Sequence, residues 1–143
     1  MIHYLAGLHN GMGEHAKALP MYERSLAFAE AKLGTDHVRT WKALSNLAVQ
    51  YHAMGKHALA RALCEQSLAI AETKLGRYHV CTGLTLYNLA MLHQAMGNYD
   101  VACSLYQLSM MIHMANLAPD HRSARVILNI LDALFQDLEE RYF

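Results

Sequence analysis

The sequence predicts an all-α repeat protein in which three antiparallel helix pairs are followed by one further helix. Three observations lead to this prediction. Residue types recur every 42 positions along nearly the whole chain, and a fixed period of this length is the signature of stacked helical or blade-like units. Within each period, apolar residues follow the i, i+3, i+4, i+7 spacing of amphipathic helices. The 143 residues also include only 2 prolines and 8 glycines, the residue types that interrupt helices.

The 42-residue period recurs without insertions. Gly13, Gly55 and Gly97 are each 42 residues apart. The same spacing relates several further sets: Leu5, Leu47, Leu89 and Leu131; Ala18, Ala60 and Ala102; Ser25, Ser67 and Ser109; and His37, His79 and His121. Because so many positions align, each period corresponds to one structural repeat, and stacked repeats bury a continuous core between neighbours.

Each repeat consists of two helices joined by a tight turn. In repeat two, Leu44, Leu47, Ala48 and Tyr51 form the apolar stripe of a first helix, and Gly55 follows as the turn residue. Glycine tolerates the left-handed backbone conformation that commonly closes a helix. The second helix then begins with a periodic alanine, a residue small enough for two helices to approach closely. Each repeat is therefore an antiparallel helix pair.

Helix stops separate the repeats without a linker. Gly34, Gly76 and Pro119 each end a second helix. Asp36 and Asp120 fall just before the next first helix, where a carboxylate can cap the helix or interact with its dipole. We expect a single array with these boundaries: repeat one, N-terminally short, at 1–34; repeat two at 35–76; repeat three at 77–118; and a capping helix at 119–143.

These features resemble the tetratricopeptide repeat, specifically the 42-residue variety of kinesin light chain and nephrocystin-like proteins. Asn46, Leu47 and Ala48, followed by Tyr51 and Gly55, match the typical first helix of that variety. Residues 33–38 read LGTDHV where the family has LGxDHP, so a valine replaces the proline. The resemblance implies a right-handed superhelix (α-solenoid) whose first helices line a concave groove, and this groove usually binds an extended or helical peptide.

Family register then predicts which residues line the groove, because the interior-facing stripe leaves a neighbouring face of each first helix free. The predicted groove residues are Lys42, Ser45, Asn46, Val49 and His52 in repeat two; Tyr87, Asn88, Met91 and Gln94 in repeat three; Asn129, Ala133 and Gln136 in the capping helix; and His3, Tyr4 and Asn10 in repeat one. Amide side chains suit the N–H and C=O groups of a peptide backbone. Alternatively, Asn46 and Asn88 only satisfy neighbouring backbone groups of their own chain.

Composition narrows the partner and the compartment. Twelve Lys and Arg balance twelve Asp and Glu, which does not suggest nucleic acid or an anionic membrane surface. No window approaches the roughly 20 apolar residues of a membrane span, and the first residues do not resemble a signal peptide. Cys64, Cys81 and Cys103 form no CxxC motif, which favours free thiols in a reducing compartment, packed as small apolar residues. We expect a cytoplasmic protein that binds a protein or peptide.

The ten histidines do not indicate chemistry once they are placed in the repeat. His9 and His93 align with Tyr51 and Phe135, so they occupy packing positions for aromatic rings. The connector histidines occur once per repeat, and packed helices lie about 8–10 Å apart, too far to share a metal ion bound at about 2.0–2.1 Å. No nucleophile with a paired base is recognisable. We therefore predict no catalytic residues, no metal and no cofactor.

The sequence thus predicts a protein–protein interaction module, an adaptor or scaffold. An alternative is an assembly element that forms homo-oligomers or continues a longer solenoid through its ends, because the first repeat is short and the last helix is apolar. The residues Met110, Met111, Ile112 and Met114 are expected to pack the third repeat against the capping helix, although they also suit an exposed patch for a partner.

Overall fold

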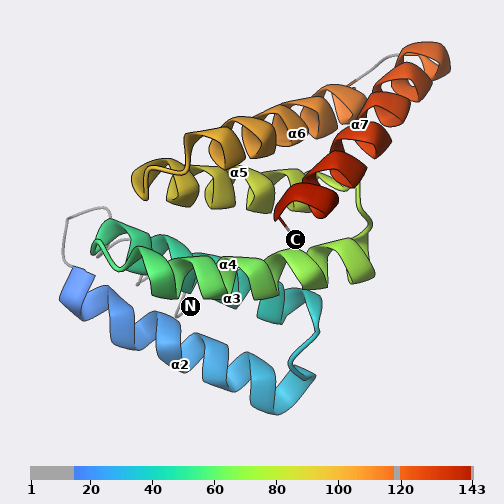
Figure 1. Cartoon of the computed structure of the whole chain (residues 1–143). Coiled ribbons are helices and arrows are strands. Elements are labelled where there is room, and N and C mark those ends of the chain that lie inside the picture. The colour runs from blue at the N-terminus through green and yellow to red at the C-terminus, as the bar shows by residue number, and fades with distance from the viewer. Residues whose placement is uncertain (1–14, 118–119, 143) are drawn as a thin grey trace. The chain divides into compact units, whose positions relative to one another are not determined.

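The computed structural model describes residues 15–117 and 120–142, which are helical apart from short turns (Figure 1). The elements are α2 (His15–Leu33), α3 (Val38–Ala53), α4 (His57–Ile70), the π-helical turn η1 (Ala71–Leu75), α5 (Val80–Ala95), α6 (Tyr99–Leu117) and α7 (His121–Tyr142). The expectations for His3, Tyr4, Asn10, Gly13 and Pro119 lie outside the described residues.

The chain divides into two compact units, Met1–Ile70 and Ala71–Phe143. In the first unit, α3 packs against both α2 and α4. In the second unit, α5 packs against η1 and α6, and α6 packs in turn against α7. Within residues 15–117 and 120–142, each unit therefore contains one predicted helix pair, α3 with α4 and α5 with α6, and α2 or α7 packs against it.

The turn within each helix pair closes at the predicted glycine. Gly55 and Gly97 adopt positive φ angles of 79° and 85°. After them, the Lys56 N–H donates to the Tyr51 carbonyl at 2.9 Å, and the Asn98 N–H donates to the His93 carbonyl at 2.8 Å. These bonds satisfy carbonyls that the end of a helix would otherwise leave unpaired. The glycine period therefore marks the turns, as predicted.

Buried residues of the first unit lie on α2, α3 and α4, and one apolar cluster lies between α2 and α3. Ala18, Tyr22 and Leu47 are buried together, and Leu26 and Tyr51 are partly buried against them. Leu47 and Tyr51 belong to the amphipathic stripe predicted for the first helix of repeat two. Because this stripe packs on the second helix of repeat one, it buries apolar area between repeats as well as within one.

The periodic serines of α4 and α6 attach these second helices to α3 and α5, their first helices. The Ser67 hydroxyl on α4 donates to the Trp41 carbonyl on α3 at 3.2 Å and also lies 2.6 Å from the Ser45 hydroxyl oxygen. One repeat later, the Ser109 hydroxyl donates to the Gly83 carbonyl at 2.7 Å. The serine period thus has a structural reason, since a buried hydroxyl needs a hydrogen-bond partner.

The core of the second unit lies between α5 and α6. Its largest fully buried aliphatic side chains are Leu86, Leu89 and Leu92 on α5 and Leu105, Leu108 and Ile112 on α6, and Leu131 of α7 joins them. Gly83 permits the closest approach of the two helices, because a Cβ atom at this position would lie 3.0 Å from Cγ2 of Ile112. Such a distance is shorter than carbon atoms in a packed interior maintain. The two helices therefore approach where Gly83 carries no side chain.

The connector between repeats one and two contains three recurring features. Gly34 has a φ of 101°, the His37 ring accepts a hydrogen bond from the Arg39 N–H at 3.1 Å, and the Thr40 hydroxyl donates to the Gly34 carbonyl at 2.6 Å. The next connector repeats these features with Gly76, His79, Cys81 and Thr82. Both connectors therefore start the following helix in the same way.

At α3 the N-cap residue is His37 and not Asp36, whereas the capping role expected for Asp120 is confirmed. His37 is the N-cap residue of α3, with Nδ1 as the acceptor. At α7, Asp120 accepts a hydrogen bond from the Ser123 N–H at 2.6 Å. The imidazole of His37 is one residue closer to the orphan N–H groups of the helix than the carboxylate of Asp36, and this placement decides which side chain caps.

Helix α7 packs by one apolar face. Leu131, Phe135 and Leu138 are buried, and the Phe135 ring lies 6.1 Å from the ring of Tyr78, centroid to centroid. The connector before α7 has Ala118 and Ala124 where the other two connectors have the positive-φ glycine and the threonine. This connector therefore lacks the residues that direct α3 and α5 into their positions.

Candidate functional site

The predicted groove residues within the described ranges are all accessible. Those that are exposed are Lys42, Val49, Tyr87, Gln94, Asn129, Ala133 and Gln136, and those that are half-buried are Ser45, Asn46, His52, Asn88 and Met91. They form one strip on α3, which we call the α3 strip (Lys42, Ser45, Asn46, Val49 and His52), one on α5, the α5 strip (Tyr87, Asn88, Met91 and Gln94), and a separate face of α7.

Two members of the α3 strip are held by side chains of α4. The Ser45 hydroxyl pairs with that of Ser67, as described above. His52 Nδ1 lies 3.2 Å from His57 Nδ1, with ring centroids 5.2 Å apart. Burial lowers the pKa of His52, and the nearby His57 lowers it further. The imidazole of His52 is therefore biased towards its neutral form, which offers a ligand one donor or one acceptor.

The α5 strip is apolar and aromatic along one side. Tyr87 is 44% exposed, and its ring meets that of Tyr106 on α6 edge-on, with centroids 5.5 Å apart. The Tyr106 hydroxyl donates to Oε1 of Gln94 at 2.7 Å. Burial raises the pKa of Tyr106, so the hydroxyl remains a donor. Leu84, which sequence analysis did not assign to the groove, is also exposed one turn before Tyr87.

Helix α5 carries no Asp, Glu, Lys or Arg. Its buried face carries three leucines along with Thr82, Thr85 and His93, and Leu84, Tyr87 and Met91 place apolar side chains on its accessible face. Accessible apolar side chains gathered on one face of a helix make this strip a candidate contact surface. The uncharged character of this strip could be read from the sequence, because Leu84 holds the position of Lys42 in the α3 strip.

The two asparagines of the strips differ in their partners. Asn46 already has an interaction within the chain. The half-buried amide of Asn88, by contrast, has no hydrogen-bond partner among residues 15–117 and 120–142. An amide that is partly desolvated without a partner gains most from a ligand that supplies one.

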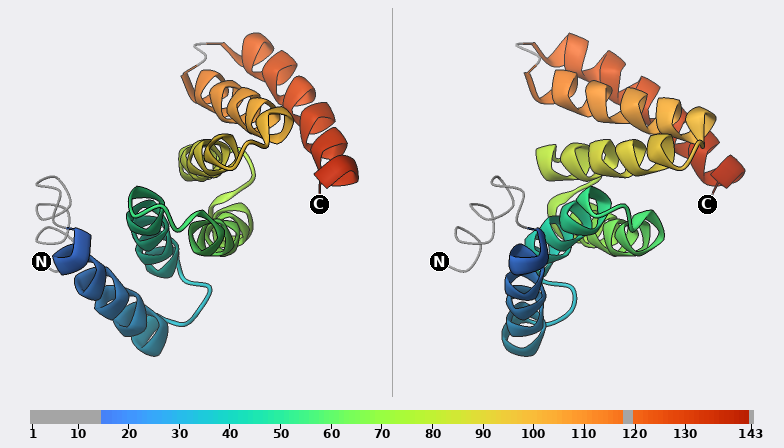
Figure 2. Two further views of the ribbon diagram at one scale, coloured as in Figure 1. Left: turned by 60° about the vertical axis from the view of Figure 1, so that its left-hand side comes forward. Right: turned by 90° about the vertical axis from the view of Figure 1, so that its left-hand side faces the viewer.

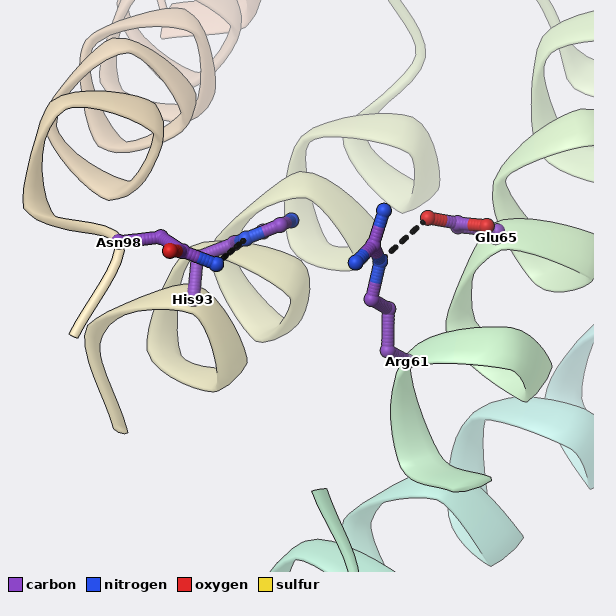
Figure 3. Close-up of polar contacts among 4 residues, drawn as sticks. All are labelled: Arg61, Glu65, His93 and Asn98. Atoms are coloured by element: carbon purple, nitrogen blue, oxygen red, sulfur yellow. Dashed lines mark hydrogen bonds and ion pairs between the residues drawn. The ribbon is translucent and has the colours of Figure 1, made fainter. Parts of the chain in front are cut away.

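Three histidines of the described part of the chain serve packing or helix capping. His93 is buried, and its Nδ1 lies 3.2 Å from Nδ2 of Asn98 in the turn after α5 (Figure 3). His37 and His79 cap helices. Within the ranges that the structure describes, no three His, Cys, Asp or Glu side chains are grouped to hold a metal ion. The packing prediction for His93 is confirmed.

The three cysteines occupy different environments. Cys64 is buried, as expected of a packing residue, and burial raises the pKa of its thiol to about 12. Cys81 is half-buried. Cys103 is exposed on α6, so the packing prediction does not hold for it. None of the helices in the described ranges has the length and apolarity needed to cross a membrane.

The apolar residues near the end of α6 are only partly packed. Ile112 is fully buried and Met111 is half-buried, whereas Met110 and Met114 are exposed. The expectation that all four pack the third repeat against the capping helix is therefore wrong for Met110 and Met114, because α7 does not cover them.

Solved structures of similar fold identify the architecture of this chain. The chain is similar to the nearly identical TPR-like repeats of a Podosopora anserina protein described as a kinesin light chain, with 26% identity and a TM-score of 0.76 over 94% of this chain and 64% of that chain. A point variant of that protein gives 24% identity and a TM-score of 0.75, over 97% and 68% of the respective chains. The all-α superhelical repeat fold is thereby confirmed.

The chain spans about 64% of the length of the first of these structures. None of the curated proteins compared with it gives a significant match. The family model described as tetratricopeptide repeat matches residues 1–73 and again residues 41–112. These two matches together cover more than half of the sequence, and the chain belongs to the tetratricopeptide repeat family.

Proposed function

We propose that this chain is an adaptor or scaffold module that binds a peptide or helical segment of a partner protein through its first-helix strips. Tetratricopeptide repeats generally mediate protein–protein interactions, and this family is one of interaction scaffolds and not of enzymes. We accordingly propose no catalytic role and no bound cofactor. The observation that carries the proposal is the accessible, uncharged α5 strip with the unpartnered Asn88 amide.

The side chains of the α5 strip suit a peptide in two ways. Tyr87 and Met91 offer aromatic and adaptable apolar contact. Asn88 offers both a donor and an acceptor to the peptide backbone, and the NH₂ group of Gln94 remains available while its Oε1 accepts from Tyr106. The preferred ligand therefore presents an apolar side chain next to an accessible backbone amide.

The α3 strip is more polar, with Lys42, Ser45 and His52 among its members. Its only formal charge near neutral pH is that of Lys42. Because neither strip concentrates positive charge, we expect binding to depend weakly on salt, unlike nucleic-acid binding, whose affinity falls steeply as salt is added. We propose a protein partner in the cytoplasm and no nucleic acid or membrane surface.

The direct test is to select ligands from a peptide library with the whole chain and to measure their affinities for Asn88→Ala and Asn46→Ala. We expect Asn88→Ala to weaken binding by roughly tenfold, the effect of about one lost hydrogen bond, and Asn46→Ala to weaken it less. Gln107→Ala, an exposed amide on α6, is the matched control. Ligands that tolerate both asparagine substitutions would rule out the strips as the binding surface.

A second candidate function is self-association through the outer face of α7. Val126 is 54% exposed on this face, and Ile130 is exposed beside it. Arg122 and Arg125 lie near the start of the helix, and acidic residues lie near its end. Two α7 helices that pair antiparallel would place opposite charges against each other, which favours an isologous dimer.

This second candidate has a separate test. Light scattering of the wild-type chain should show a concentration-dependent dimer, and Ile130→Glu should abolish it, while Phe28→Glu on the exposed side of α2 should not. A strict monomer at high concentration would exclude self-association and leave the peptide-binding proposal intact.

A further inference from the structure

One side of α6 is open although the corresponding side of α2 is covered. We call the α6 seam the set of residues Cys103, Tyr106, Met110, His113 and Leu117. These residues are spaced alternately by three and four positions, so they lie along one face of the helix. In repeat one, the same positions on α2 are Leu19, Tyr22, Leu26, Ala29 and Leu33.

On α2, this face packs against α3. Tyr22 is only 7% exposed and is buried with Leu47 of α3, and Leu19 and Leu26 pack against the same cluster. On α6, the counterpart of Leu26 is Met110, which is 57% exposed, and Leu117 is 81% exposed at the end of the seam. Apart from His113 and the Tyr106 hydroxyl, the α6 seam is thus apolar, but it lacks the helix that covers its counterpart.

The opposite side of α6 is more buried than the corresponding sides of α2 and α4. Ser104, Met111 and Ala115 are half-buried on α6, whereas the residues at the same positions on α2 and α4 are all exposed. The exposed counterparts are Pro20, Ala27 and Ala31 on α2 and Ala62, Ala69 and Thr73 on α4. Since α7 packs against α6 and runs beside it (Figure 2), we assign the burial of this side to α7.

Helix α7 therefore lies on the side of α6 opposite to the one on which α3 lies against α2. The contact of Phe135 with Tyr78, before α5, agrees with this placement, since Met110 on the seam is 57% exposed. For this reason, the peptide contacts of the proposed function involve α3 and α5 only. Asn129 and Gln136, on the exposed face of α7, remain a prediction from register.

From these observations we infer that the α6 seam binds an amphipathic helix of a partner protein. The helix presents an uncharged face of leucine and aromatic side chains, as α3 does towards α2 with Leu47 and Tyr51. Charge agrees with this occupant, because Asp100 is the single Asp, Glu, Lys or Arg of α6. A charged face would lose its hydration against the seam without gaining an ion pair.

The seam is also continuous with the α5 strip. Tyr106, a seam residue, contacts Tyr87 and bonds to Gln94. A helix on the seam therefore reaches the edge of the strip without requiring its central amide, Asn88. The inference goes beyond the proposed function, since the side chains that hold the helix belong to a second helix of the repeat and are not strip residues.

The chain itself supplies a probe for this site. A peptide of residues 38–53, the sequence of α3, carries the face that covers the same positions on α2. Short isolated helices are marginally stable in water, so the peptide is stapled between positions 49 and 53, which are both exposed in α3. Its affinity for the whole chain is measured by fluorescence anisotropy, and its position by alkylation of Cys103 with mass-spectrometric readout.

We expect the stapled peptide to bind and to slow alkylation of Cys103. Met110→Glu should weaken binding by roughly tenfold or more, because it buries an unpaired carboxylate in the interface. Val126→Glu, at an equally exposed valine on α7, should bind with wild-type affinity. Asn88→Ala should also leave this affinity unchanged, which separates the seam from the α5 strip. Circular dichroism verifies that each variant is folded.

Each of four results would overturn the inference. The first is that the stapled peptide does not bind, and the second is that the Met110→Glu variant binds it with wild-type affinity. The third is that Asn88→Ala abolishes binding, which would place the peptide on the α5 strip. Finally, Cys103 is protected from alkylation before any peptide is added, which would mean that the seam is already covered: by α7 if the chain is a monomer, or by a second copy if light scattering shows a dimer.

Discussion

The guanidinium group of Arg77 lies over the ring of Phe135, with its carbon 4.2 Å from the ring centroid. The same group bonds to a carboxylate oxygen of Glu139 at 2.6 Å. Arg77 stands just before α5, and both of its partners belong to α7. This contact joins α7 to the start of the second helix pair.

The first prediction concerns this contact. Arg77→Ala should lower the free energy of unfolding by about 1 kcal/mol, since both partially exposed ion pairs and cation–π contacts are individually weak. Hydrogen exchange should become faster in α7 but not in α3. Arg77→Lys keeps the charge but loses the planar stacking, so it should restore only part of the protection. Unchanged exchange in α7 of the alanine variant would contradict this role.

A second prediction concerns the histidine caps. His79→Ala should destabilise the chain by roughly 0.5–2 kcal/mol, the usual loss for an N-cap, because the Cys81 N–H loses its acceptor. His79→Asn should retain most of the stability. His121→Ala is the matched control, because Asp120 caps α7 in its place. Chemical denaturation measures all three, and equal losses for His79→Ala and His121→Ala would disprove the assignment.

A third prediction concerns Cys64. Burial raises the pKa of its thiol from 9.0 to about 12. Because the folded state favours the protonated thiol, its contribution to stability is complete below pH 9 and is lost as the pH rises from 9 towards 12. Cys64→Ala should be less stable near neutral pH, since it leaves a small cavity, but should lose less stability over this alkaline range. Equal alkaline slopes of the two unfolding free energies would refute this.

The reactivity of the thiols offers a related measurement without denaturant. At pH 8, an alkylating reagent should modify Cys103, which is exposed, well before Cys64, which is buried and protonated. Cys64 should become reactive only when the chain unfolds.

A fourth prediction concerns the pair of His52 and His57. Burial and the neighbouring ring lower the pKa of His52 below its ordinary value of 6.5. The folded state therefore favours the neutral ring, and stability present above pH 6.5 should decrease as the pH falls below it. Replacing His57 by Gln removes one source of the shift, so the decrease should become smaller. A steeper acid dependence in this variant would show that His57 does not disfavour the charged form.

Residue types alone were sufficient to locate the helix pairs and their turns. Gly55 and Gly97 mark turns because a positive φ is a local requirement that glycine meets at little cost. The amphipathic stripe through Leu47 predicts its own burial for a similar reason, since the period of the side chains follows from the helix itself. Local geometry of this kind depends on only a few neighbouring residues, and it therefore recurs with the 42-residue period.

The tertiary structure decided what covers each helix. Leu26 and Met110 hold the same position in their repeats, yet one is packed and the other is exposed. Likewise, Asn46 and Asn88 share a register position, but only Asn46 has a partner among the described residues. Burial and partners depend on neighbouring helices that are distant in sequence. The repeat pattern in the sequence therefore determined the helices and their apolar faces, whereas the packing of α7 on one side of α6 determined which face remained open.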